Sequence, residues 1–340
     1  MIRRLLAAAI TLVAAAALVV ACWPQLFGLE QLWGVAQLVA LRGLAALVAV
    51  LAGVLLAMFA LLARSARRFL AGLSVLLLVF AAVTTGVLAV RGIGGGAFQT
   101  TAEGDLIVLS WNTLGDAPGA EAIASLALEQ DADVVALPET SHEAGETVQA
   151  LLAASGKPMQ LVERRLDKVS KVHSTVLLIS TALGEYLRDD TVGDTPTLPS
   201  VVAVPADGTG PTIIAAHPVS PVTAEMQNWR DGLAWLADRC ADPDADVVVA
   251  GDLNSTIDHW ARLGSDAGIA ACDDVARAVG AAGIGTWPTV MPPLLGTPID
   301  HVLATSAWRP IGFRVIESLD GAGSDHRPVV AQLRPASAAG

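Results

Sequence analysis

The chain has 340 residues, of which 53% are hydrophobic, 4% aromatic and 16% charged, and its mean hydropathy is +0.56. This composition excludes an intrinsically disordered chain and is too apolar for an ordinary soluble domain. Seven arginines and one acidic residue give residues 1–100 a net charge of +6, whereas 14 basic and 32 acidic residues give the rest of the chain −18. The negative charge of this second region argues against binding nucleic acid through a basic surface, although a bound metal ion would reverse the sign of the local electric field.

Three apolar segments without charged residues fill most of the first ninety residues. Each approaches the roughly 20 residues that a helix needs to cross a bilayer. They lie at about 5–22, 43–63 and 69–90. We therefore predict a membrane region over residues 1–91 with three transmembrane helices.

Arginines set the predicted orientation of these helices. Arg3 and Arg4 precede the first span, and three more arginines lie between the second and third, so the positive-inside rule places both sites in the cytoplasm. Because three crossings separate the two ends of the region, the rest of the chain is predicted to be extracytoplasmic, in a multi-pass protein of the cell membrane. Arg42 alone opposes this orientation, and its position is typical of an interfacial helix end or a longer, tilted helix.

The end of the first span allows a second interpretation. The arginine pair, the apolar stretch and Val19-Val20-Ala21-Cys22 are typical of a bacterial lipoprotein signal, in which Cys22 is acylated after cleavage. Two spans would then follow the lipidated cysteine and return the chain to the same face. Both interpretations argue against a purely cytoplasmic enzyme, and the sequence leaves the lipidation of Cys22 open.

Glycine-rich residues 92–101 are predicted to form a flexible linker to a globular domain at 102–335, which a disordered tail at 336–340 follows. Within the domain, short β-type apolar runs alternate with helical patterns, which favours a layered α/β fold. The predicted strands are 106–110, 133–137, 174–179, 201–204, 212–216, 246–250, 299–304 and 328–333. The predicted helices are 119–130, 143–154, 223–239 and 268–279.

Polar residues that a packed strand would not select lie at the ends of these apolar runs, where α/β folds place their sites. Each alone has a structural explanation, such as a turn at Asn112, an Asx turn at Asp252 or a satisfied buried histidine at His217. In chain order the blocks are Ser110-Trp111-Asn112, Pro138-Glu139-Thr140, Ala216-His217-Pro218, Gly251-Asp252-Leu253-Asn254, Pro298-Ile299-Asp300-His301 and Ser324-Asp325-His326.

As an ordered set, these blocks resemble the endonuclease/exonuclease/phosphatase superfamily over about residues 105–334. This superfamily of metal-dependent phosphohydrolases includes DNase I-like nucleases, inositol polyphosphate phosphatases and neutral sphingomyelinases. The resemblance implies a four-layer α/β sandwich, in which two packed β-sheets are flanked by helices. It also implies hydrolysis of phosphate esters or anhydrides with Mg²⁺ or Mn²⁺, which prefer hard oxygen ligands.

The resemblance assigns three residues to the metal. Glu139 is the principal ligand, Asn112 lies beside it, and Asp325 completes or supports the metal environment. No pair of closely spaced cysteines is present, so a zinc cage is not expected.

The resemblance assigns five further residues to catalysis. Asp252 orients or deprotonates the attacking water, and Asn254 holds water and phosphate in line. His326 donates to a phosphoryl oxygen and is oriented by Asp300, because a carboxylate fixes the imidazole tautomer. His217 contacts phosphate or assists the leaving group.

Several residues depart from this pattern. His301 stands where the superfamily often has tyrosine, and is either a packing substitution or an additional polar group near the site. His142 and His259 are interpreted as surface histidines. Cys240 and Cys272 would face an oxidising exterior and are candidates for a disulfide, which the sequence leaves open because their separation in space is unknown.

An apolar, proline-rich segment at 286–298 precedes Asp300 directly. It is either a rigid connection over the core or a lip that touches the lipid or isoprenoid part of a substrate. The candidate lip residues are Trp287, Met291, Leu294 and Leu295.

The three spans before a domain of this type also resemble the VanJ-type membrane proteins linked to teicoplanin resistance. This resemblance implies a lipid-linked substrate of the polyprenyl pyrophosphate type, confined to the same membrane as the enzyme. The alternatives are a surface nuclease acting on extracellular DNA and a membrane-anchored binding domain without turnover. The sequence gives no indication of protein partners.

Overall fold

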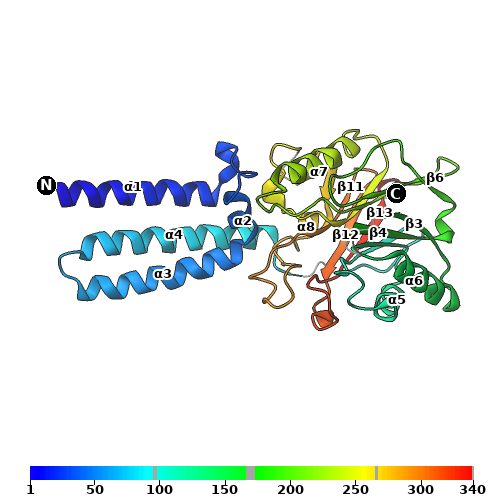
Figure 1. Ribbon diagram of the computed structural model, residues 1–340, viewed down its shortest axis with the longest axis horizontal. Helices are drawn as coiled ribbons and strands as arrows, with labels where there is room; N and C mark the ends of the chain where they lie inside the picture. Colours follow the sequence, from blue (N-terminus) through cyan, green and yellow to red (C-terminus); the bar gives the residue numbers. More distant parts are fainter. Residues whose placement is uncertain (95–97, 166–172, 265–266, 339–340) are drawn as a thin grey trace.

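The computed structural model describes residues 1–94, 98–165, 173–264 and 267–338. A bundle of three long helices projects from one side of a two-sheet domain, as Figure 1 shows. The helices are α1 (Ile2–Cys22), α3 (Arg42–Leu62) and α4 (Arg67–Arg91), and each is long and apolar enough to cross a membrane. The three predicted spans are thus confirmed as apolar helices.

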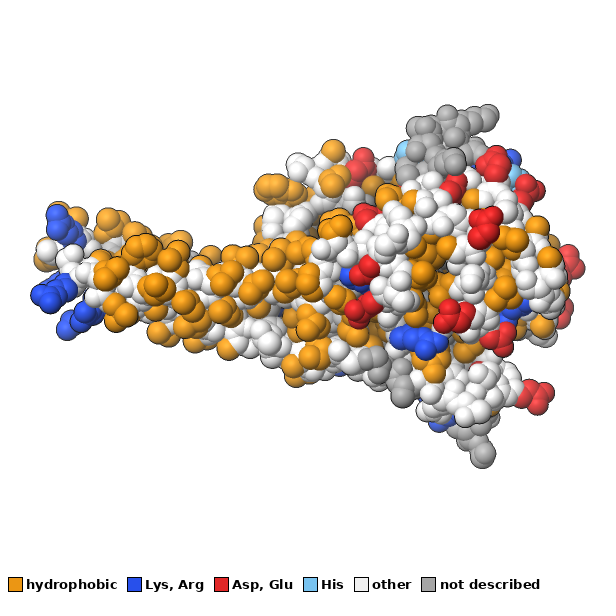
Figure 2. Space-filling view, turned by 90° about the horizontal axis from the view of Figure 1, so that it is seen from below, with side chains coloured by type: hydrophobic (Ala, Val, Ile, Leu, Met, Phe, Trp, Pro, Cys, Tyr) orange, Lys and Arg blue, Asp and Glu red, His pale blue; other side chains and the backbone are white. Residues whose placement is uncertain are grey.

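The helices of the bundle pack through small residues. Ala46, Ala49 and Gly53 of α3 face α4, where the Ser74 hydroxyl donates a 2.7 Å hydrogen bond to the Gly53 carbonyl. Large apolar side chains cover the outside of the bundle, and basic side chains gather at its free end (Figure 2). This surface is the kind that a bilayer with charged interfaces would cover.

Two short helices connect α1 to α3 and lie against the globular domain. They are the 3₁₀ helix η1 (Pro24–Phe27) and helix α2 (Val35–Ala40). The carbonyl oxygen of Gln31, between them, accepts a 2.9 Å hydrogen bond from Arg230 of the globular domain. The membrane region is therefore docked on the domain.

The globular domain contains two mixed β-sheets. The strands of the first, in spatial order, are β12 (Trp308–Val315), β13 (Val329–Pro335), β1 (Leu106–Ser110), β2 (Val134–Pro138), β4 (Ser174–Ser180) and β3 (Met159–Arg165). The strands of the second are β5 (Tyr186–Arg188), β6 (Val201–Pro205), β7 (Thr212–Ala216), β8 (Val247–Asp252), β11 (Asp300–Ala304), β10 (Cys272–Asp274) and β9 (Gly268–Ile269).

Successive side chains of a strand point to opposite faces of its sheet, so the domain has one apolar layer between the sheets and one on the outer face of each sheet. Val108 of β1 points into the core between the sheets, whereas its neighbour Leu109 packs under α5 (Ala120–Glu129) and α6 (His142–Ala154). On the second sheet, α7 (Met226–Arg239) covers the outer face. The expected sandwich of two sheets flanked by helices is confirmed.

Some local predictions are wrong. The predicted helix at 268–279 is replaced by β9, β10 and the short helix α8 (Val275–Ala278), because β10 pairs with β11 and is tied to α7 by a disulfide. Strands β3, β5 and β12 were not predicted, since these outer strands are partly exposed and rich in polar residues. The tail begins with the 3₁₀ turn η6 (Ala336–Ala338), and residues 339–340 lie outside the described part. The other 3₁₀ helices are η3 (Thr181–Leu183), η4 (Ile257–His259) and η5 (Glu317–Leu319).

The predicted linker is held at both ends. The carbonyl of Gly92 accepts a 2.8 Å hydrogen bond from the Gly283 amide, and Phe98 packs beside Gly312 and under the Arg314 guanidinium. A free tether does not describe this end of the segment, because the half-buried Phe98 packs against the core of the domain. The glycine-rich residues 95–97 lie outside the described residues.

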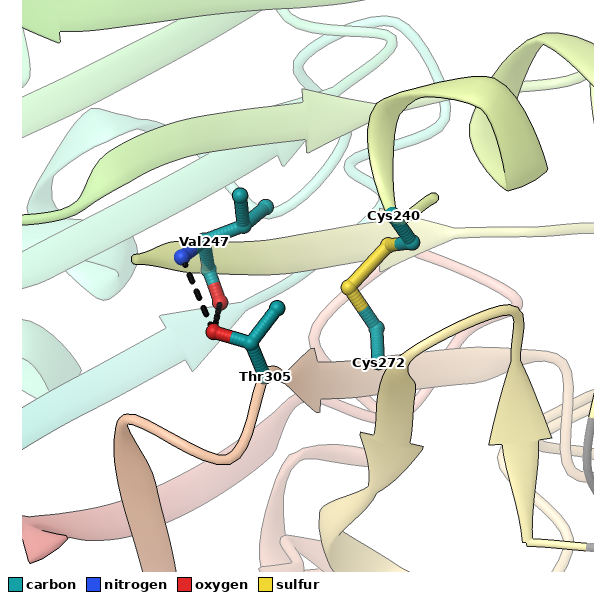
Figure 3. Close-up of a disulfide and its surroundings, with 4 residues drawn as sticks. All are labelled: Cys240, Val247, Cys272 and Thr305. Carbon is teal, nitrogen blue, oxygen red and sulfur yellow. Dashed lines mark hydrogen bonds between the residues drawn. A yellow bond between two sulfur atoms is a disulfide. The ribbon is translucent and has the colours of Figure 1, made fainter. Parts of the chain in front are cut away.

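A disulfide joins Cys240, at the end of α7, to Cys272 in β10 (Figure 3). Beside it, the Val247 amide donates a 3.1 Å hydrogen bond to the Thr305 hydroxyl and so links β8 to the end of β11. Both sulfurs are buried under the second sheet. The disulfide candidate is therefore present, and it reinforces the sheet that carries Asp252 and Asp300.

Replacing both cysteines with serine should lower the free energy of unfolding by about 3–4 kcal/mol, because the bond closes a loop of 32 residues' separation. The thermal midpoint of the full chain in detergent measures this loss. The reduced wild-type protein should unfold at the same lowered temperature as the double variant. An unchanged midpoint in both samples would contradict the stabilising role.

Candidate active site

The topology brings the polar blocks to one edge of the two sheets. Asn112 and Glu139 follow the parallel strands β1 and β2, while His217 and Asp252 stand at the ends of the parallel strands β7 and β8. Asp300 begins the antiparallel strand β11 directly opposite Asp252. The residues predicted from the strand ends therefore meet in space.

Asn112 ties the two halves of the site together. Its side-chain Nδ2 donates 3.0 Å hydrogen bonds to Oε1 of Glu139 and to Oδ2 of Asp252, although these residues come from different sheets. Its Oδ1 accepts a 3.0 Å hydrogen bond from the Leu114 amide. In this arrangement the Asn112 amide orients two carboxylates, and its own oxygen is already engaged.

Two residues of the site have strained backbone conformations. Glu139 and Asn254 both have positive φ angles, 56° and 45°, in the left-handed region that non-glycine residues rarely occupy. Next to them, a Cβ on Gly251 would lie 1.9 Å from the Ala216 carbonyl oxygen, so only glycine fits there. These conformations turn the Glu139 and Asn254 side chains into the site.

Asp252 is held on several sides. Its Oδ1 accepts a 2.8 Å hydrogen bond from the Asn254 amide, and the Asn254 side chain lies 3.2 Å from Oδ2. Burial raises the pKa of Asp252 well above its ordinary value, and the Asp300 carboxylate acts in the same direction, whereas His326 opposes them. A carboxylate of raised pKa is suited to accept a proton.

His326 and Asp300 form the predicted carboxylate–imidazole pair. Nδ1 of His326 lies 2.9 Å from Oδ2 of Asp300, and its Nε2 lies 3.7 Å from Oδ2 of Asp252. Burial alone would lower the pKa of His326, but the carboxylates of Asp300 and Asp252 raise it to about 10. The imidazole is therefore protonated at neutral pH and can donate a hydrogen bond to an anion.

His217 has the opposite character. It is fully buried, its Nε2 lies 3.6 Å from Oε1 of Glu139, and neither ring nitrogen has a hydrogen-bond partner among the described residues. Burial lowers the pKa of His217 to about 3, and the nearby His326 adds to this effect. His217 is thus a neutral imidazole with free polar atoms at the site.

The donor set fits a divalent cation. Burial raises the pKa of Glu139, and the buried Oδ1 atoms of Asp300 and Asp325 have no hydrogen-bond partner among the described residues. With Asp252 the site holds four carboxylates, an excess of negative charge that a hard cation would neutralise. Asp252, Asp300 and His326 also lie close enough together to share an ion.

Glu139, Asp252, Asn254 and His326 line a cleft of about 460 Å³ whose walls are largely apolar, whereas Asp300 and Asp325 are not among its lining residues. One wall comes from the membrane region, through Gln37, Ala40 and Leu41 at the end of α2 and just before α3. The Gln37 side chain donates a short hydrogen bond to the Pro221 carbonyl, which fixes this wall. Sequence reasoning missed these residues because no local pattern connects them to strand ends so far along the chain.

The predicted lip divides into two parts. Trp287 lines the cleft, and its Nε1 donates a 2.8 Å hydrogen bond to Oδ2 of Asp325. Leu294 and Leu295 do not line it, because their backbone passes over Gly43 at the start of α3, where a Cβ would meet the Leu294 carbonyl oxygen at 1.8 Å. Met291 also lies outside the lining.

The remaining histidines take different places. His301 is buried behind the cleft, where Nδ1 lies 2.6 Å from Oδ2 of Asp274 and Nε2 lies 3.0 Å from the Ser255 carbonyl. His142 is half-buried beside Glu163. The prediction of a surface position for His259 is wrong: it is 1% exposed, because Nδ1 accepts from the Thr256 amide and the membrane region covers its other side.

Asp258 is a buried acidic residue that the sequence did not single out. It binds Arg42 at 2.7 Å and Arg91 at 2.7 Å, at the ends of α3 and α4. The arginine interpreted as an interfacial helix end is thus 4% exposed and paired across the junction with the domain. The position of Arg42 could have suggested such an ion pair from the sequence, since a charged residue at the end of an apolar span usually has a partner.

Comparison with known proteins agrees with this geometry. The profile of the Endonuclease/Exonuclease/phosphatase family matches residues 109–326. Humanised D. rerio TDP2 shares the fold at 20% identity, over 68% of this chain and 100% of that one, with a TM-score of 0.52. A family protein from Beutenbergia cavernae does so at 23% identity, over 68% and 72%, with a TM-score of 0.51. No curated protein is similar enough in sequence to count as a relative. The chain belongs to the Endonuclease/Exonuclease/phosphatase family.

Proposed function

We propose that the protein is a membrane-anchored, metal-dependent phosphohydrolase whose catalytic domain faces the extracytoplasmic side. Its substrate carries a phosphate ester or anhydride on a lipid, of the polyprenyl pyrophosphate type. The family supports phosphoester hydrolysis, and the apolar helices support membrane attachment. The arginines at the free end of the bundle support the orientation.

One observation carries the choice of substrate. The cleft that contains Glu139 and Asp252 is bounded by Leu41, the residue immediately before the membrane helix α3. A phosphate at the catalytic groups is therefore adjacent to the level at which the chain enters the bilayer. A substrate anchored in the same membrane would reach this cleft at a high effective concentration.

Glu139 and Asp325 would hold Mg²⁺ or Mn²⁺, while Asn112 keeps Glu139 in place. The ion, when bound, supplies positive charge to the phosphoryl oxygens. Asp252 accepts a proton from the attacking water, as its raised pKa favours. Asn254 is placed to orient that water, because its side chain is fixed to Asp252 and to the Pro218 carbonyl at 3.0 Å.

His326 donates a hydrogen bond to a phosphoryl oxygen and stabilises the negative charge of the transition state. Asp300 keeps the ring protonated and oriented, while the Trp111 indole holds the His326 backbone carbonyl at 2.9 Å. His217 offers a neutral nitrogen near Glu139 and contacts the phosphate or the leaving group.

A surface nuclease is the competing function. A D. rerio TDP2 structure of the same fold is complexed with a single-strand DNA product. Against this function, the domain is strongly acidic, and the cleft is lined mainly by apolar groups. The basic residues Lys168 and Lys171, which extend the only arginine-rich stretch of the domain, lie outside the described residues. A binding domain without turnover would have no need for the opposed pKa shifts of His217 and His326.

Replacing Leu41 with serine should lower kcat/KM for a polyprenyl pyrophosphate by about tenfold, the effect of losing one apolar contact, and for a soluble phosphodiester by less than twofold. The full chain in detergent is assayed with both substrates. Leu38→Ser is the matched control, because Leu38 lies three residues before Leu41, on α2, but is exposed outside the cleft. Equal losses on both substrates would contradict a lipid-binding wall.

A further inference from the structure

A second cavity of about 530 Å³ lies between the membrane helices and the globular domain. It is separated from the catalytic cleft by the junction where Arg42 meets Asp258, because neither residue lines the cleft. Its walls come from the end of α1, the last two turns of α4 and the segment around η4. The proposed hydrolysis makes no use of this space.

The polar side of the cavity carries an excess of positive charge. Arg42 and Arg91 share the single carboxylate of Asp258, each through two hydrogen bonds. Arg277 of α8 adds a third guanidinium at the rim, where its described contact is a 3.4 Å hydrogen bond to the Val90 carbonyl. The neighbouring Asp274 carboxylate acts on Arg91 but accepts its hydrogen bonds from the Arg277 amide and pairs with His301, and no ion pair joins it to the Arg277 guanidinium among the described residues.

The other side of the cavity is an apolar groove on α4. Val83, Val87 and Val90 line it, and Gly86 leaves a gap between them, because a Cβ at this position would meet no atom within 4 Å. Val83 and Val90 are also exposed on the outside of the bundle, so the groove opens onto the surface that lipid chains would cover. Cations beside an apolar groove at a helix end are complementary to a lipid phosphate and its chain.

We propose that this cavity binds one anionic phospholipid from the leaflet on the domain's side of the membrane. Its headgroup phosphate lies between Arg91 and Arg277, and the start of an acyl chain follows the groove at Gly86. Trp23, which lines the same cavity and is half-exposed, is typical of a residue at the level of the headgroups. The proposal rests on insertion of α4 in a membrane and is independent of hydrolysis.

A lipid bound in this cavity would act on the junction at Asp258, which lies close in the chain to the site residue Asn254. Asp258 follows Asn254 by four residues, and the lipid phosphate would lie against the arginine that binds Asp258. A ligand that binds only the docked state stabilises it in proportion to its concentration. An anionic lipid should therefore raise the temperature at which the full chain unfolds.

The test uses the full chain in detergent micelles, with EDTA present so that no metal-dependent turnover occurs. The probes are dioleoylphosphatidylglycerol, dioleoylphosphatidylcholine and inorganic phosphate, and native mass spectrometry measures the lipid retained. We expect phosphatidylglycerol to be retained about fivefold better than phosphatidylcholine, the effect of one cation at a membrane surface. Arg277→Gln and Gly86→Leu should abolish this preference.

Two matched variants control the experiment. Gly72→Leu places the same side chain in open space near the other end of α4, and Arg309→Gln removes an exposed arginine of β12. Both should keep the wild-type preference. Equal retention of the two lipids, or loss of the preference in Gly72→Leu as well, would overturn the proposal. If inorganic phosphate raises the unfolding temperature as much as phosphatidylglycerol does, the site binds free phosphate and the assignment to a lipid is wrong.

Discussion

Replacement of Asp252 by asparagine is expected to lower kcat by about 10²–10⁴-fold, the usual contribution of a general base. The substitution keeps the size of the side chain but removes the proton acceptor between Asn112, Asn254 and His326. Phosphate release by the full chain with Mg²⁺ or Mn²⁺ measures this loss. Asp238→Asn, on the exposed side of α7, is the matched control and should keep wild-type activity.

The same variant should not lose stability. Burial and Asp300 raise the pKa of Asp252, so its ionised form destabilises the folded protein at pH values above the ordinary carboxyl pKa. In EDTA, Asp252→Asn should unfold at or above the wild-type temperature. Activity within twofold of wild type, or a loss of activity accompanied by unfolding, would contradict the assigned role.

Replacement of Asp258 by asparagine is expected to lower the free energy of unfolding by about 3–5 kcal/mol, because it leaves two buried guanidinium groups without their counter-ion. Thermal unfolding of the full chain in detergent measures the change. Asp190→Asn breaks two half-exposed ion pairs, with Arg164 and Arg188, and this control should cost less than about 1 kcal/mol. Equal shifts in the two variants would show that the Asp258 cluster does not stabilise the junction.

The pH dependence of this cluster has a defined sign. Burial alone would raise the pKa of Asp258, but Arg91 and Arg42 hold it far below its ordinary value. A depressed carboxyl pKa contributes stability that is complete above the unfolded value of about 3.9 and is lost as pH falls below it. The difference between wild type and Asp258→Asn should therefore be constant from pH 5 to 8 and should shrink in acid.

The catalytic half of the site could be predicted from sequence because its signals are local. Apolar strands such as β1 and β8 end directly in Asn112 and Asp252, and parallel neighbours bring such ends together. The disulfide could be proposed but not established, since it depends on the distance between Cys240 and Cys272. The prediction of a helix at 268–279 was wrong for a related reason, because the pairing of β10 with β11 overrides the local helix propensity.

The contribution of the membrane region could not be predicted in the same way. Arg42 and Asp258 are 216 residues apart, and neither has a sequence neighbour that suggests the pair. Likewise, Leu41 and Trp287 meet around one cleft only because the membrane region docks on the domain. Helix α2 and Leu41 of the N-terminal region therefore form part of the wall of the candidate active site.

The most direct test is phosphate release by the purified full chain from a polyprenyl pyrophosphate in detergent, with plasmid DNA as the competing substrate and Asp252→Asn as the inactive control. We expect release from the lipid with Mg²⁺ or Mn²⁺, and none with EDTA or in the variant. DNA nicking that Asp252→Asn abolishes, without release from the lipid, would instead identify a nuclease. Activity on neither substrate would contradict the assignment of an enzymatic function.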